Sequence, residues 1–316
     1  MVNIDADTIV YLKRVGSYAI HYNANVTNQF IRDIPEMLWW QKILQPFLNL
    51  EDLSILRCTN TFFQSYWESV VLIQNVIRVP QGCPTVEKAM ALAVVFSGKK
   101  EYTKADPLKI QVDVGVHEVV VGGYGMVDVT CSHITFVGNG NDQTTIRGGF
   151  RVNNQQNVKF EELTITNRNG YGLRLRGSET NVDVLKCVVK ECGWTGMAVG
   201  GGATVTATQC EFMENGGNGV LCDDANTKAR LNECQMHHNG FDGLWALNGA
   251  VVDLHGTKTD IHSNKADGIW ASSRGKVNIH LPSQHNTSHD NVRGDRIQNT
   301  GGSIANINAD GTFTHT

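Results

Sequence analysis

The sequence predicts a mainly β chain in which residues 107–316 form a right-handed parallel β-helix, a solenoid of stacked coils. Two observations predict it: a glycine-anchored repeat, and apolar residues that alternate within each repeat instead of following a helical period. Five segments align on a glycine, namely YGLRL at Gly172, TGMAV at Gly196, NGVLC at Gly219, DGLWA at Gly243 and DGIWA at Gly268. The steps between these glycines are 24, 23, 24 and 25 residues, a period typical of a solenoid.

Alternation within each repeat predicts which side chains point inward. One column after the glycines contains Leu173, Met197, Val220, Leu244 and Ile269, and the next contains Leu175, Val199, Cys222, Ala246 and Ala271. A second strand contributes Cys187, Cys210, Cys234 and Thr259, followed by Val189, Phe212, Met236 and Ile261. Equivalent side chains should stack at the parallel-strand spacing of about 4.8 Å. We interpret the stacked cysteines as a ladder of small buried hydrophobic side chains.

Asparagines recur in step with the glycines, at Asn215, Asn239, Asn264 and Asn291. Asn tolerates the left-handed backbone conformation that a tight corner demands, and stacked Asn side chains can hydrogen-bond from coil to coil. We therefore expect an asparagine ladder whose members adopt that conformation.

Residues 71–106 are expected to be a linker and a capping helix. Thr85 can cap the segment TVEKAMALAVVF, with Glu87 in the first turn where the helix dipole favours an anion. Val86, Met90 and Ala93 lie at helical spacing, so this helix should cover the open end of the solenoid. The segment from Lys99 to Asp106 is expected to be a solvated loop.

Composition excludes several classes of function. The 316 residues carry a formal net charge of −4, which favours neither a nucleic acid nor a membrane surface as partner. The N-terminus shows no secretory signal and no stretch reaches the length of a membrane span. The eight cysteines contain no CxxC pair, so we expect reduced thiols in a cytoplasmic or nuclear protein, with no structural zinc and no cofactor.

Residues 1–70 are predicted to form an N-terminal helical segment. Within it, residues 34–67 place apolar residues at helical spacing, in the sequence IPEMLWWQKILQPFLNLEDLSILRCTNTFFQSYW. Pro35 suits a helix start, and the stretch around Asn49 breaks the pattern. Such a helical hairpin could cap the β-helix or dock on another protein.

The same segment resembles the F-box, on the residues Pro35, Leu38, Ile43, Leu44, Leu48, Leu50, Asp52, Leu53, Leu56, Arg57, Cys58, Phe62 and Phe63. An F-box followed by coils such as PLKIQVDVGVHEV is similar to F-box receptors with carbohydrate-binding and sugar hydrolase repeats. The resemblance implies a substrate receptor that links a target protein to a cullin-based ubiquitin ligase. A Skp1-type adaptor would bind Leu38, Ile43, Leu44, Leu53 and Leu56. The chain is short and shows no Cys/His-rich module after the capping helix, which separates it from that family.

Parallel β-helices of the pectin-lyase-like fold often cleave or epimerise polysaccharides, so an enzyme is a further possibility for this chain. Asp242 and Asp267 both precede an anchor glycine and should lie one coil apart, as a pair of catalytic carboxyl groups would. Asn218 fills the same position one coil earlier, which favours a polar corner instead. The alternative is an intracellular lyase or epimerase that uses Asp242, Asp267 and His262.

His237, His262 and His289 share one coil position beside the asparagine corner. Three stacked imidazoles could bind a metal, but Lys190 and Met213 occupy this position in earlier coils, which favours a tolerant outward site.

The outward residues that follow the first inward column are Arg174, Ala198, Leu221, Trp245 and Trp270. Two tryptophans one coil apart predict a recognition surface for sugar rings or for apolar side chains of a partner, unless a loop covers them. The leading hypothesis is therefore a non-enzymatic F-box-type receptor that presents an unidentified target protein on its β-helix. The alternatives are the carbohydrate-active enzyme and a non-catalytic carbohydrate-binding or structural protein.

Overall fold

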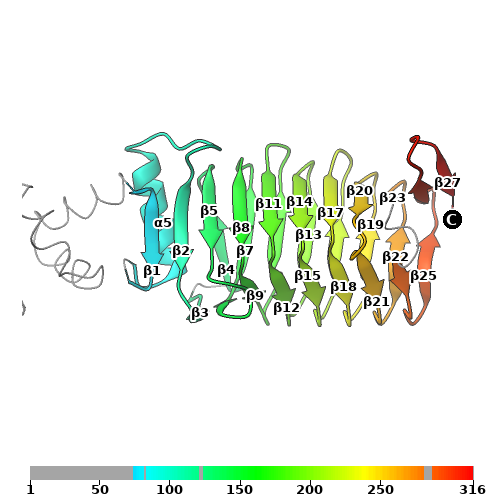
Figure 1. Ribbon diagram of the computed structural model, residues 1–316, viewed down its shortest axis with the longest axis horizontal. Coiled ribbons are helices and arrows are strands. Elements are labelled where there is room, and N and C mark those ends of the chain that lie inside the picture. Colours follow the sequence, from blue (N-terminus) through cyan, green and yellow to red (C-terminus); the bar gives the residue numbers. More distant parts are fainter. Residues whose placement is uncertain (1–73, 82, 121–123, 281–286, 316) are drawn as a thin grey trace, which may run out of the picture. The chain divides into compact units, whose positions relative to one another are not determined.

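The computed structural model describes residues 74–81, 83–120, 124–280 and 287–315. Its solenoid unit, residues 75–80 and 84–316, is built from three parallel sheets that the chain visits in turn, coil after coil (Figure 1). Eight coils each contribute one strand to sheet A, one to sheet B and one to sheet C. The prediction of a parallel β-helix is confirmed.

Sheet A contains, in spatial order, β1 (Val76–Val79), β2 (Leu108–Val112), β5 (Ile134–Val137), β8 (Val158–Glu161), β11 (Asn181–Leu185), β14 (Thr204–Thr208), β17 (Lys228–Asn232), β20 (Val251–His255), β23 (Lys276–His280), β26 (Ser303–Ile307) and β27 (Phe313–His315). Sheet B contains β3 (Gly115–Glu118), β6 (Thr144–Arg147), β9 (Thr164–Thr166), β12 (Val188–Lys190), β15 (Glu211–Met213), β18 (Gln235–His237), β21 (Asp260–His262) and β24 (Ser288–His289). Sheet C contains β4 (Met126–Val129), β7 (Gly149–Asn153), β10 (Leu173–Arg176), β13 (Met197–Gly200), β16 (Val220–Cys222), β19 (Leu244–Ala246), β22 (Asp267–Ala271) and β25 (Gly294–Gln298). All neighbours are parallel except β26 and β27.

The predicted interior columns are present. Leu173, Met197, Val220, Leu244 and Ile269 are in register on consecutive strands of sheet C, and all five are fully buried. The cysteine ladder is also buried, and burial raises the pKa of the Cys187 and Cys234 thiols. These thiols therefore stay protonated and behave as small apolar side chains. Nearer the N-terminal end, Phe136, Phe150 and Phe160 fill the interior with ring centroids 4.9–5.2 Å apart.

The first coil is covered as expected. Helix α5 (Val86–Ser97) starts at Thr85, whose hydroxyl oxygen accepts a hydrogen bond from the Lys88 amide at 3.3 Å. Its buried face packs on β1, β2 and β4 at the end of the coil stack (Figure 1). Strand β1 is an addition to the expected linker, because Ile77 and Val79 alternate inward and extend sheet A by one strand.

The asparagine ladder forms, but its backbone conformation differs from the expectation. The Asn215 side-chain amide donates to Asn239 Oδ1 at 3.0 Å, and the same contact continues to Asn264 and Asn291 at 2.9 Å. The left-handed conformation lies one residue earlier, with φ between 51° and 56° at Glu191, Glu214, His238, Ser263 and Asp290. The ladder residue itself must point inward to reach the next coil, so the preceding residue makes the corner.

Candidate functional site

The outward residues of sheet C form one continuous row along the solenoid. Strand pairing places Arg151, Arg174, Ala198, Leu221, Trp245, Trp270 and Ile297 in register on consecutive coils. We call this row the sheet C column. It contains the four predicted surface residues Arg174, Leu221, Trp245 and Trp270, all of them partly exposed. The column changes from charged at one end to apolar at the other.

The two tryptophans stack face to face. Their ring centroids are 4.4 Å apart with planes inclined by 8°. Trp245 Nε1 donates to Ser272 Oγ at 3.0 Å, which fixes that ring. Because the stacking direction follows the solenoid axis, the remaining ring faces are directed toward the column neighbours Leu221 and Ile297. A ligand that approaches the sheet therefore meets the ring edges together with the aliphatic side chains of the column.

A second aromatic group adjoins the charged end of the column. Trp194 packs against Tyr124 at 4.8 Å and against Tyr171 at 4.9 Å between ring centroids. Trp194 is 41% exposed and Tyr124 is 52% exposed. The Arg174 guanidinium lies over the Tyr171 ring, 5.6 Å from its centroid. The sequence pattern does not reveal this group, because Tyr124 is 70 residues before Trp194 and the turns that carry these residues vary in length.

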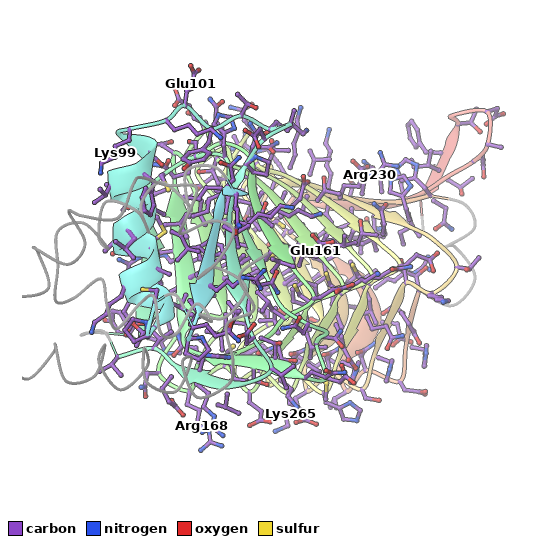
Figure 2. All side chains as sticks on the ribbon, turned by 60° about the vertical axis from the view of Figure 1, so that its left-hand side comes forward. Lys99, Glu101, Glu161, Arg168, Arg230 and Lys265 are labelled. Carbon is purple, nitrogen blue, oxygen red and sulfur yellow. The ribbon has the colours of Figure 1, made fainter. Side chains whose placement is uncertain are left out.

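These turns join sheet B to sheet C and form one edge of the solenoid. Arg168, in the turn after β9, and Lys265, in the turn after β21, both project from the lower edge in Figure 2. Phe241, in the turn after β18, is 58% exposed. The aromatic side chains of the turns and of sheet C thus lie on adjoining surfaces.

Asp242 and Asp267 occupy neighbouring coils as predicted, and the side chains of Asn218 and Asp242 cap two successive corners. Asn218 Oδ1 accepts the Asp242 amide hydrogen bond at 3.0 Å, and Asp242 Oδ1 accepts that of Asp267 at 2.9 Å. Both side chains are almost fully buried. Burial raises the pKa of Asp242 to about 6. Burial also raises the pKa of Asp267, and the positive charge of Arg293 partly offsets this second shift. Oδ1 of Asp242 is occupied by its hydrogen bond from the Asp267 backbone amide.

The third candidate for catalysis, His262, lies across the corner from these carboxyl groups, on β21 of sheet B. Its ring stacks between His237 and His289, with centroids 4.8 and 5.3 Å away, so the predicted imidazole row is present. His237 Nε2 contacts Glu211 Oε1 at 2.7 Å, and His289 Nε2 contacts Asp260 Oδ1 at 3.0 Å. The three proposed catalytic residues are consequently divided between two faces of the solenoid.

Burial lowers the pKa of His262, and the neighbouring imidazoles lower it further. The pKa of His289 is raised, chiefly by its hydrogen bond to Asp290. In the ranges that the structure describes, no group of three or more His, Cys, Asp or Glu side chains is arranged to hold a metal ion. None of the helices in the described residues has the length and apolar character that a membrane span requires.

The adaptor-binding residues predicted from sequence, Leu38, Ile43, Leu44, Leu53 and Leu56, lie outside the described residues. All of residues 34–67 lie outside the described residues, so the F-box interpretation remains a prediction.

Comparison with known proteins agrees with the topology. The family described as "Right handed beta helix region" matches residues 116–234, and no curated protein sequence matches the chain. A similar solved structure, ORF18 of Geobacillus virus E2, has 10% identity and a TM-score of 0.49 over 78% of this chain; the match spans 64% of the viral chain, less than two thirds of its length. Pectin methylesterase from carrot has 13% identity and a TM-score of 0.38, covering 72% of this chain and 82% of the enzyme.

The A-module of mannuronan C-5 epimerase AlgE4 from Azotobacter vinelandii is similar to the same extent, with 12% identity and a TM-score of 0.38 over 72% of this chain and 79% of the module. These structural neighbours include carbohydrate-active enzymes, but at such identities the likeness concerns the fold alone. The family match and the three-sheet topology together show that the chain contains a right-handed parallel β-helix.

Proposed function

We propose that this protein is a non-enzymatic, F-box-type substrate receptor of a cullin-based ubiquitin ligase, which presents a target protein on the sheet C column. Residues 34–67 would bind a Skp1-type adaptor, and the β-helix would bind the target. Ubiquitin transfer would belong to the partner ligase, so the chain itself needs no cofactor.

The observation that carries the target-binding half is the stacked pair Trp245 and Trp270 within an otherwise apolar stretch of the column. Partly exposed aromatic side chains next to aliphatic ones are typical of protein interfaces. Pyranose rings bind aromatic residues through a free ring face, and both tryptophans direct their faces along the column instead. The surface therefore favours a polypeptide partner.

The adaptor-binding half depends on the resemblance of residues 34–67 to the F-box. We expect the full chain to co-purify with a Skp1-type adaptor, and Leu44→Asp to abolish this. Ser54→Asp, a polar position in the same segment, is the matched control. Trp245→Ala/Trp270→Ala should retain the adaptor, because the tryptophans belong to the target surface. Failure of the parent chain to bind the adaptor would refute the receptor role.

A carbohydrate-active enzyme is the second candidate, and the raised pKa of Asp242 favours it. A carboxyl group with a pKa of about 6 is protonated often enough near neutral pH to act as a general acid. Product release from uronate polymers by the parent chain, and its loss in Asp242→Asn, would establish this activity. The hydrogen bond from the Asp267 amide to Asp242 supports the corner-cap role instead.

A further inference from the structure

We infer that the target segment bound by the sheet C column is an extended peptide that carries an acidic side chain for Arg174 and, four residues later, an apolar side chain for Trp245. This inference rests on the proposed function and adds the chemistry of the partner. Three observations support this inference. They are the ion pairs of the arginines around Arg174, the apolar surface beyond Arg174 in the column, and the spacing of the coils.

Arg174 differs from the two arginines beside it. Arg151, one coil earlier, pairs with Asp128 at 3.0 Å, and Arg176 pairs with Asp224 at 2.9 Å. Arg174 forms no ion pair within the described part of the chain, and its guanidinium lies on the Tyr171 ring. Tyr171 in turn packs on Trp194. The cation is thus held in place on an aromatic support, with its charge available to a carboxylate.

The positions beyond Arg174 are apolar. Ala198 and Leu221 separate it from Trp245 in the column. Ala198 is the smallest side chain of the row, so a ligand side chain can approach the sheet most closely there. The order cation, small residue, aliphatic residue, aromatic ring complements a ligand whose acidic end is followed by apolar side chains.

The spacing of the coils selects an extended ligand. Three coil steps separate Arg174 from Trp245, which corresponds to about 14 Å at about 4.8 Å per step. An extended chain advances about 3.3 Å per residue, so four residues span this distance, and residues i, i+2 and i+4 all face the column. A helix would need between nine and ten residues, at about 1.5 Å each, to span the same distance. Because a helix has about 3.6 residues per turn, the side chain at that position points away from the column. An extended segment therefore fits both anchors at once.

The test uses the full chain as bait for a displayed library of random nonapeptides. We expect the enriched peptides to contain Asp or Glu followed four residues later by an aromatic or large aliphatic residue. The consensus peptide, labelled with a fluorophore, is then titrated by anisotropy. Arg174→Met should weaken binding about tenfold, the loss expected for one charge-assisted contact, and Trp245→Ala by at least as much.

Arg151→Met is the matched control, since its charge is already paired with Asp128, and it should change binding by less than about twofold. Enrichment of no peptide, enrichment without an acidic residue, or equal effects of Arg174→Met and Arg151→Met would each overturn the inference. Oligogalacturonate that binds in an Arg174-dependent way while no peptide is enriched would overturn it in favour of a polyuronate ligand.

The same variants separate this inference from the receptor role. Leu44→Asp should bind the consensus peptide normally, and Arg174→Met should retain the adaptor. Loss of the peptide result with adaptor binding intact would refute the inference alone. Loss of adaptor binding with the peptide result intact would refute the receptor role alone.

Discussion

Replacement of Asn239 by alanine tests the asparagine ladder that connects the coils. Asn239 is fully buried on the sheet B side of the corner. Its Oδ1 accepts the Asn215 backbone amide at 3.2 Å and the Asn215 side-chain amide at 3.0 Å, and its own Nδ2 donates to the Phe212 carbonyl at 3.0 Å. Alanine would remove these three bonds and also the bond from Nδ2 to Asn264 Oδ1 at 2.9 Å, and it would leave the Asn215 backbone amide and the Phe212 carbonyl without these partners. The Asn215 side chain would keep its bond to Val189.

Each buried polar group left unsatisfied costs about 1–3 kcal/mol, so the loss of partners for two such groups in Asn239→Ala should lower the free energy of unfolding by about 2–6 kcal/mol. Urea titration followed by far-ultraviolet circular dichroism measures the change. Asn232→Ala is the control, because Asn232 lies on the outward face of β17 and its loss should cost less than about 1 kcal/mol. Equal destabilisation by the two variants would refute the assigned role of the ladder.

Three further changes test the corners and the titratable groups by thermal unfolding. Asp242 has a folded-state pKa of about 6, above its unfolded value of 3.8, so the native state binds the extra proton and loses stability as pH rises between these values. Asp242→Asn should therefore stabilise the protein at neutral pH and remove this slope; an unchanged slope would contradict the burial of the carboxyl group. The pKa of His262 is lower in the folded state than in the unfolded state, so the unfolded state binds the proton more tightly and the protein loses stability as the pH falls below the unfolded pKa. His262→Gln should therefore lose less stability than the parent between about pH 7 and about pH 5. Glu214 adopts φ 54°, and Glu214→Gly should stabilise by up to about 1 kcal/mol because glycine tolerates this conformation. Met213→Gly in the adjacent strand should destabilise, and stabilisation by both changes would rule out relief of backbone strain as the cause.

Much of the solenoid could be predicted from sequence because a parallel stack fixes register. Once the glycine period is known, each residue's neighbours in the next coils follow, and the inward column from Leu173 to Ile269 was predicted this way. The outward order from Arg174 to Trp270 followed from the same alternation. The ladder from Asn215 to Asn291 was predicted as a set of hydrogen bonds for the same reason.

Other features depend on geometry that the period does not encode. The left-handed corner residues differ in type from coil to coil, as Glu214, His238 and Ser263 show, so no residue preference reveals them. The stacking of Trp245 on Trp270 depends on side-chain torsions, which decide whether a ring face or a ring edge is exposed. The contact of Tyr124 with Trp194 depends on the paths of two turns.

The proposed function requires that one chain bring a target segment on sheet C to a ligase bound by residues 34–67. Reconstituted ubiquitin transfer to a lysine placed beside the consensus peptide measures both halves together. We predict transfer with the parent chain, and its loss both in Leu44→Asp and in Arg174→Met/Trp245→Ala. Transfer that survives either change, or that never occurs although peptide and adaptor both bind the parent chain, would contradict the claim.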